Sequence, residues 1–259
     1  MKNLTYKLIL LLFIASGKFY GFNKLQTNYT LTASQKDSIG SIQMEIDNSL
    51  SKSLELNSLK PLEQYSKHLT ANEMVYSENS IRYWQAYISY QKAVYYLIQG
   101  DQSASEESCD FGIGLLNHND NKNSEDYALL ANLEAFSIQF KGAKVLVIAP
   151  RLRKNARKAI ALDSLNLRAF YVLGSNDFYT PKQYGGGKKT ELYLKKALSI
   201  PSKKNTNSFS PSWGREESYA LLAQFYLEEN FPTKAQDIIN EGLLIFPENY
   251  QLKILLKKL

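Results

Sequence analysis

The sequence has few of the residues on which several common architectures depend. One cysteine among 259 residues excludes an internal disulfide, so the fold must be held together by packing. Thirteen glycines and seven prolines are few for a turn-rich β protein of this length, which favours long helices. The two histidines, His68 and His118, have no second histidine or cysteine at ligand spacing. We therefore expect neither a transition-metal site nor a Ser-His-acid triad, and no cofactor.

A long apolar run is also missing, and the short one at the N-terminus has the form of an export signal. Residues 8–15 (LILLLFIA) are too few to span a bilayer, follow the basic residues Lys2 and Lys7, and lead into the small residues Ala15-Ser16-Gly17. Residues 1–21 are therefore predicted to be a signal peptide, with a retained N-terminal anchor as the alternative. The expected location is exported and periplasmic, with no stable membrane insertion after cleavage.

The charge balance does not call for a nucleic-acid partner. The formal net charge is +6, and it falls to +3 once Lys2, Lys7 and Lys18 of the acid-free N-terminal segment are set aside. Apolar residues make up 44% and charged residues 22% of the chain, which is typical of a globular protein. We therefore expect a compact protein with a mild basic surplus.

Helical periodicity divides the chain after the signal. Residues 22–33 form a polar lead-in, and two helices are expected within 34–78. The first is marked by Ile39, Ile42, Ile46 and Leu50 at steps of three and four residues, and the second begins at Pro61. From residue 79 to residue 259 the helices come in pairs. First helices are predicted at 79–99, 124–142, 166–179 and 215–229, second helices at 103–117, 149–162, 188–200 and 233–246, and a capping helix at 248–258.

The second helices share a pattern in which a small residue leads an apolar run. The leading residues are 47, 38 and 45 residues apart, within the range of helical-pair repeats with loop insertions. They are Gly112, Ala159, Ala197 and Gly242.

The first helices share another pattern, an aromatic residue followed by leucine and a small residue. It occurs as Tyr127-x-x-Leu130-Ala131, Phe170-x-x-Leu173-Gly174 and Tyr219-x-x-Leu222-Ala223. A small residue allows the partner helix to approach closely, while the ring and the leucine fill the space between pairs. A non-repetitive helical bundle is the alternative that these patterns leave open.

With these residues, the chain resembles the tetratricopeptide repeat (TPR) family over roughly residues 80–250. The last pair matches best, at Tyr219, Leu222, Ala223, Tyr226, Ala235, Ile239, Gly242 and Pro247. The middle pairs depart from the motif, with Glu134 and Asp177 where tyrosine is expected. Residues 181–187 are also similar to exported helical-repeat proteins, including the T component of tripartite periplasmic transporters.

The resemblance implies an all-α fold in which antiparallel helix pairs stack as a TPR-like α-solenoid. It also implies a non-catalytic scaffold that binds a protein or peptide partner in a concave groove lined by the first helices. The residue after each small position should face that groove. Two residues earlier on the helix predicted at 166–179 could join them. The predicted groove residues are Asn132, Arg168, Tyr171, Ser175 and Gln224. The alternative function is a small-ligand-binding accessory component of an envelope transporter.

Three further patterns have structural interpretations that we prefer to catalytic or binding ones. The glycine run 185–187 before Lys188 lacks the earlier glycine of a phosphate loop, so we expect a tight connection between helices. Cys109 lies three residues before a small leader, where the other pairs have apolar residues, so we expect a buried filler. The basic run from Arg151 to Lys158 is expected to be a solvated helix face.

Overall fold

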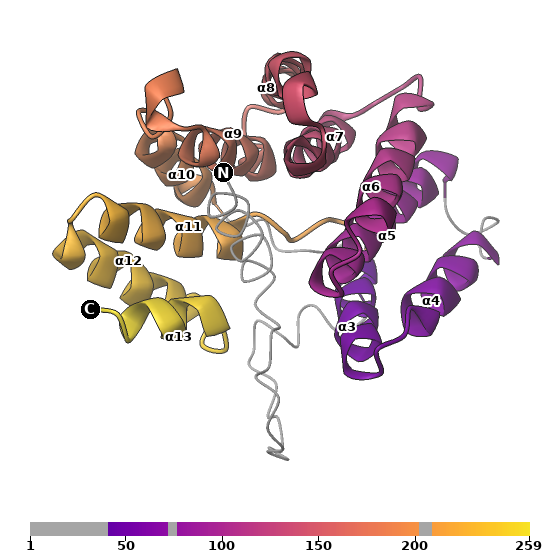
Figure 1. Ribbon diagram of the computed structural model, residues 1–259, viewed down its shortest axis with the longest axis horizontal. Helices are drawn as coiled ribbons and strands as arrows, with labels where there is room; N and C mark the ends of the chain where they lie inside the picture. The colour runs from indigo at the N-terminus through magenta and orange to yellow at the C-terminus, as the bar shows by residue number, and fades with distance from the viewer. Residues whose placement is uncertain (1–40, 72–76, 202–208) are drawn as a thin grey trace.

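The computed structural model describes residues 41–71, 77–201 and 209–259, and within these ranges the chain is helical without a strand (Figure 1). The predicted signal peptide (1–21), the lead-in (22–33) and Ile39 lie outside the described residues. None of the helices in the three described ranges combines the length and the apolar character needed to cross a membrane. The predicted all-α class is confirmed.

The helices correspond closely to the predicted ones. In chain order they are α3 (Ile42–Glu55), α4 (Lys60–Ala71), α5 (Glu78–Ile98), α6 (Gln102–Asn117), α7 (Ser124–Ser137), α8 (Val145–Leu162), α9 (Leu167–Tyr179), α10 (Thr190–Ser199), α11 (Arg215–Glu228), α12 (Pro232–Ile245) and α13 (Tyr250–Leu256). Short 3₁₀ turns lie at η1 (Ile138–Phe140), η2 (Gly142–Lys144) and η3 (Lys182–Tyr184).

Side chains just before the helices explain where several of them begin. The Asn123 side chain accepts hydrogen bonds from the first turn of α7, while the Asp126 carboxylate accepts one from the Asn123 backbone N–H, forming a capping box. Asn166 caps α9, and Asn249 caps α13 in the same way. Pro232 occupies the first position of α12, where its missing N–H costs nothing. Local sequence therefore fixes these starts.

The connection between α7 and α8 differs from the prediction. The helix predicted at 124–142 ends at Ser137, and two 3₁₀ turns follow it, the second of which begins at Gly142 with a positive φ of 49° that an α-helix does not allow. The helix predicted at 149–162 begins earlier, at Val145, and contains Pro150. A proline this close to a helix start removes only one backbone hydrogen bond, so the extra turn before it is retained.

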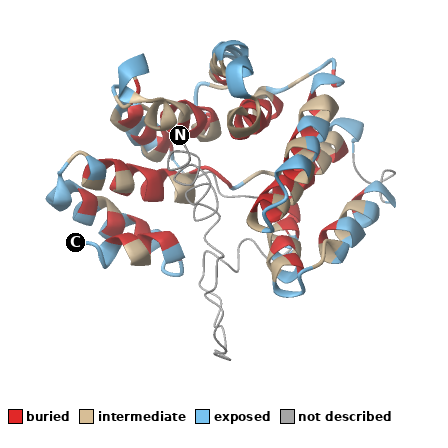
Figure 2. Ribbon diagram, in the orientation of Figure 1, coloured by how far each residue is buried: buried red, intermediate tan, exposed pale blue. Residues whose placement is uncertain are grey.

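Neighbouring helices pack as pairs around an arc (Figure 1). The pairs are α3–α4, α5–α6, α7–α8, α9–α10 and α11–α12, and α13 packs on both helices of the last pair. Consecutive pairs also touch, through contacts of α6 with α7, of α8 with α9 and of α10 with α11. In addition, α9 contacts both α7 and α11. As a result α7 and α11 are buried over most of their surface, whereas α8 and α12 bury a single stripe (Figure 2).

The predicted small positions are points where helices come close together. A Cβ atom on Gly174 would lie 2.7 Å from the Cδ2 atom of Leu194 on α10, and one on Gly242 would lie 2.6 Å from the Cδ1 atom of Leu252 on α13. A Cβ atom on Gly112 would lie 3.1 Å from the Cβ atom of Ser89 on α5. These separations are too short for a larger side chain unless the facing side chain or its helix moves.

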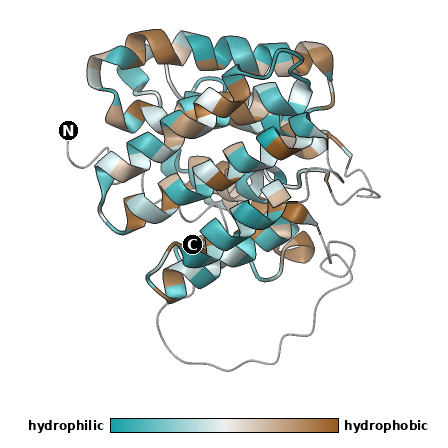
Figure 3. Cartoon of the chain, turned by 90° about the vertical axis from the view of Figure 1, so that its right-hand side faces the viewer, coloured by the Kyte–Doolittle hydropathy of each residue, from teal (hydrophilic) through white to brown (hydrophobic). Residues whose placement is uncertain are grey.

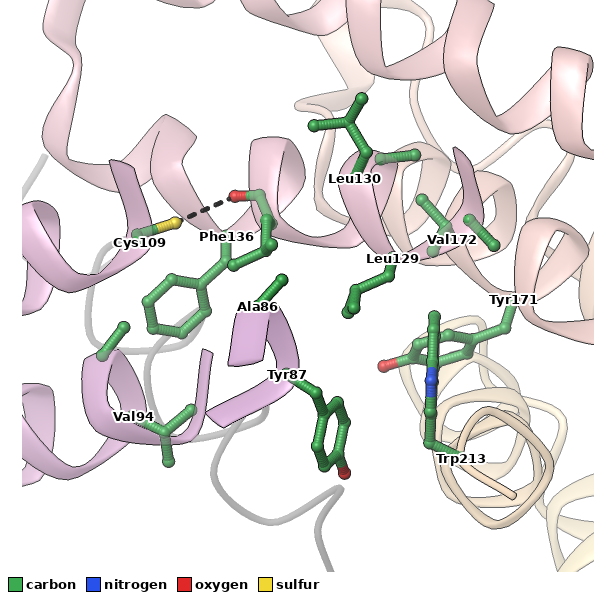
Figure 4. Close-up of a cluster of buried hydrophobic side chains, with 14 of the residues drawn as sticks. Ala86, Tyr87, Val94, Cys109, Leu129, Leu130, Phe136, Tyr171, Val172 and Trp213 are labelled. Atoms are coloured by element: carbon green, nitrogen blue, oxygen red, sulfur yellow. Dashed lines mark hydrogen bonds between the residues drawn. The ribbon is translucent and has the colours of Figure 1, made fainter. Parts of the chain in front are cut away.

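Cys109 is buried as expected. It and the corresponding residues of the other second helices, Ala156, Leu194 and Ile239, are each 0% exposed. The Cys109 thiol donates a hydrogen bond to the Leu133 carbonyl oxygen at 3.1 Å (Figure 4), and burial raises the pKa of the thiol. A thiol in such surroundings is not a nucleophile, because the thiolate form is disfavoured.

The burial pattern of α11 allows a test of which side of this helix faces the core. Ala223 is fully buried in a cluster with Tyr219 and Ile239, so Ala223→Leu should lower the free energy of unfolding by about 1–3 kcal/mol through overpacking. Gln224 is partly exposed and its amide oxygen is buried without a hydrogen-bond partner, so Gln224→Leu should cause no loss and can raise the free energy of unfolding. Denaturant melts of both variants measure the two effects. A larger loss from Gln224→Leu would contradict the position of α11.

Candidate partner-binding face

The five predicted groove residues lie on three neighbouring first helices. Asn132 is on α7, Gln224 is on α11, and the other three, Arg168, Tyr171 and Ser175, are on α9, which packs against both. Asn132, Tyr171 and Ser175 are only 8%, 5% and 7% exposed, while Arg168 and Gln224 are partly exposed. The structure therefore brings these residues to adjoining helices, and most of them are held in packed surroundings.

Asn132 and Ser175 lie near tyrosines of the first helices. Burial raises the pKa of the Tyr90 and Tyr171 phenols. Asn132 acts on Tyr90 of α5 and Ser175 acts on Tyr171 one turn away, and each lowers the pKa of its phenol by less than burial raises it. Both tyrosines are therefore neutral at ordinary pH and present hydroxyl groups rather than charge.

A connection that the sequence did not reveal packs against α3, α5 and α9. Residues 209–214, which we call the strap, lead into α11 (Figure 1). The Gln43 amide oxygen on α3 accepts the backbone N–H groups of Ser212 and Trp213 at 2.7 and 3.1 Å. The Trp213 indole N–H donates to the Tyr83 hydroxyl of α5 at 2.9 Å. The strap thus links the beginning of the described chain to its last helix pair.

Arg168 and Tyr171 contact this strap. The Arg168 guanidinium pairs with both carboxylate oxygens of Glu125 and donates to the Pro211 carbonyl oxygen at 3.1 Å. The Tyr171 ring meets the Trp213 ring edge-on, with 6.3 Å between centroids (Figure 4). Both residues are thus engaged within the chain, and their contact with a partner stays a prediction.

Two glutamine amide oxygens in this region have no hydrogen-bond partner. Gln91 on α5 donates from Nε2 to the Asp47 carboxylate at 2.9 Å, which fixes the amide orientation and leaves Oε1 buried and unpaired. Gln224 donates to Glu228 at 2.9 Å and also leaves a buried, unpaired Oε1. Gln91 was missed in the sequence because α5 is aromatic around much of its circumference and no spacing distinguished this residue.

Glu217 on α11 influences the tyrosines of this face electrostatically. Its carboxylate raises the pKa of Tyr87, Tyr90 and Tyr171, although burial is the largest cause for each. The pKa of Glu217 itself is raised to about 8, first by burial and then by Glu216. Its Oε2 atom accepts the Gly214 N–H at 2.7 Å, which holds the strap at the start of α11.

The positions that depart from the TPR motif carry polar links between helices. Glu134 accepts hydrogen bonds from Arg151 at 2.5 Å and Asn155 at 2.8 Å, both on α8. Burial raises the pKa of the Glu134 carboxyl, against these two partners. Asp177 accepts the Lys189 N–H at 2.7 Å and the Thr190 hydroxyl at 3.0 Å, at the start of α10. Each acid ties a first helix to its second helix.

The glycine run is a tight connection, as predicted. Gly185 and Gly187 have positive φ angles of 87° and 81°, and a Cβ atom on Gly186 would lie 1.7 Å from the Thr180 carbonyl oxygen. These conformations require glycine and pack the turn against the end of α9.

A hollow of about 300 Å³ lies elsewhere, between α6 and α8. Its lining includes the apolar residues Ile113 and Ile148 and the basic residues Lys141, Lys144 and Arg151. None of the five predicted groove residues lines it. Among the described residues, no three histidine, cysteine or acidic side chains gather where they could hold a metal ion.

The packed helix pairs define the protein as an all-α protein. Comparisons with protein-family models, with curated proteins and with solved structures found no match to this chain.

The raised pKa of Glu217 predicts a pH-dependent stability. Between about pH 4.5 and 8 the folded chain retains a proton that the unfolded chain has lost, so the free energy of unfolding should fall as the pH rises. The slope contributed by Glu217 should stay below about 1.4 kcal/mol per pH unit, the limit for one group. Glu217→Gln keeps the acceptor for Gly214 and should flatten the profile. Denaturant melts across this range measure it, and equal slopes in both proteins would contradict the assignment.

Proposed function

We propose that this protein is an exported, non-catalytic scaffold of TPR-like helix pairs that binds a protein or peptide partner. The binding face is formed by α5, α7, α9 and α11 on the inside of the arc. The repeated positions support the solenoid part of this proposal. Four corresponding residues of the second helices are fully buried, and the small residues lie at close helix crossings. In a stack of similar helix pairs, corresponding positions of successive pairs have the same surroundings, as these positions do.

The unpaired amide oxygens of Gln91 and Gln224 are the observation that carries the binding role. A buried acceptor without a partner costs about 1–3 kcal/mol, and that cost is recovered when a donor arrives. An extended peptide offers backbone N–H groups at short intervals and can supply such donors. Gln91 is on α5 and Gln224 is on α11, the outer two of the four helices that form the proposed face.

The other polar residues of this face have two roles in the proposal. Asn132 and Ser175 present polar groups on the helices between the two glutamines. Arg168 and Tyr171 hold the strap and so shape the face from α9. The alternative role, a small-ligand accessory of an envelope transporter, calls for a pocket lined by these same side chains. The hollow between α6 and α8 is lined by none of them, so it gives that role no support.

Peptide display tests the proposal. Peptides selected from a random library on the full chain should bind less tightly to Gln224→Leu, by about tenfold, because one acceptor is lost. The matched control is Gln236→Leu on the exposed face of α12, which should bind them unchanged. Fluorescence anisotropy of a labelled peptide measures both dissociation constants. Equal affinities for the two variants would contradict binding at this face.

A further inference from the structure

The outward face of α8 carries a concentration of positive charge. The helix, Val145–Leu162, contains Arg151, Arg153, Lys154, Arg157 and Lys158 and no aspartate or glutamate. Lys144 precedes it directly. At 100° per residue, Lys154, Arg157 and Lys158 lie within one exposed sector, opposite the buried stripe of Leu152, Ala156 and Ala159. The charges therefore face away from the protein together.

Little of this charge is neutralised by the surrounding residues. Glu134 pairs with Arg151, and the neighbouring acids Glu106 and Asp110 of α6 both pair with Lys141. Lys144, Lys154 and Arg157 form no ion pair with any described residue, and Lys158 lies over the Tyr127 ring at 4.5 Å. A row of unpaired cations repels itself and attracts an anionic partner.

Two large apolar side chains stand out at one end of this face. Leu146 and Val147, in the first turn of α8, are 79% and 67% exposed. Val147 also lines the hollow between α6 and α8, together with Lys144 and Arg151. Along the helices in general, hydrophobic and hydrophilic residues alternate around the circumference (Figure 3). Apolar tips beside unpaired cations are typical of helices that lie at a lipid interface.

We infer that the outward face of α8 binds the surface of an anionic phospholipid membrane. Lys144, Lys154, Arg157 and Lys158 contact the lipid phosphates, while Leu146 and Val147 enter the interfacial region. The attachment is reversible and lies on the bilayer surface, since α8 keeps its other side packed on α7 and α9. A membrane fits this face better than an acidic protein does, because protein interfaces are poor in lysine and bury their apolar anchors. This surface is separate from the proposed peptide-binding face and does not depend on it.

Vesicle sedimentation of the full chain tests this inference. The chain should bind vesicles containing about 30% phosphatidylglycerol in phosphatidylcholine and bind pure phosphatidylcholine weakly. The triple variant Lys144→Gln, Lys154→Gln, Arg157→Gln should bind the anionic vesicles about 10-fold to 100-fold less tightly. Leu146→Ser with Val147→Ser should weaken binding about tenfold, because the apolar tips are lost. Arg151 is left unchanged in these variants because it pairs with the buried Glu134.

Matched controls separate this surface from charge in general. The triple variant Lys52→Gln, Lys60→Gln, Lys67→Gln removes the same charge from exposed positions on α3 and α4 and should bind like the unmodified chain. Leu244→Ser, at a residue 86% exposed on α12, is the apolar control. Residues 1–40 are the same in all variants, so a difference between the two triple variants reports α8 alone.

Three results would overturn the inference. The first is an equal loss of binding in both triple variants, and the second is equal binding to anionic and neutral vesicles. The third is failure to bind vesicles together with α8-dependent binding of polyglutamate, which would point to an acidic protein partner instead. None of these results bears on peptide binding at Gln91 and Gln224, which the display experiment tests separately.

Discussion

The arrangement of the last helix pair relative to the first helices depends on the two hydrogen bonds that the Gln43 side chain accepts. Backbone N–H groups in a connection need partners, and those of Ser212 and Trp213 find them on α3 rather than in their own helix pair. With the strap held there, the Trp213 ring lies against Tyr171 and the Trp213 indole reaches Tyr83. The link spans most of the described chain, so it restrains an arc that otherwise rests on contacts between neighbouring pairs.

This restraint also shapes the inside of the arc. Gly214 ends the strap and donates its N–H to the Glu217 carboxylate, a partly buried acid whose charge raises the pKa of Tyr87, Tyr90 and Tyr171. Hydroxyl groups, amides and one carboxyl group therefore lie along this face. Arg168, the cation among the predicted groove residues, is paired with Glu125. The outward face of α8 has the opposite character, with unpaired cations and protruding apolar tips. The two faces differ in the chemistry of the partner that each can attract.

Local patterns predicted much of this fold because each one reports on a neighbouring turn or helix. Helical periodicity located the helices, small residues marked the close crossings at Gly174 and Gly242, and spacing placed Cys109 in the core. The predicted start of α8 was wrong, since the helix begins at Val145 and contains Pro150 in its second turn. The glycines at residues 185–187 could be assigned to a tight turn, because consecutive glycines mostly occur where the backbone needs positive φ angles.

Contacts between distant residues left no comparable signal. The bonds from Gln43 to the strap join polar groups far apart in the chain, and a lone glutamine in a helix predicts nothing about its partner. The unpaired oxygen of Gln91 follows from the position of Asp47 on another helix pair, which periodicity does not encode. Arg168 and Tyr171 were placed on the correct helix, but their contacts with the strap depend on how that connection returns to α3 and α5.

Native-state hydrogen exchange on Gln43→Leu tests the strap most directly. The substitution leaves two N–H groups without an acceptor, which should cost about 1–3 kcal/mol each. If the strap joins the ends of the arc, amides of α3 and of the first turns of α11 should lose protection together and by similar free energies. Gln64→Leu, at an exposed position on α4, should leave both unchanged. Loss of protection in α3 alone, with α11 exchanging as in the unmodified chain, would contradict the account.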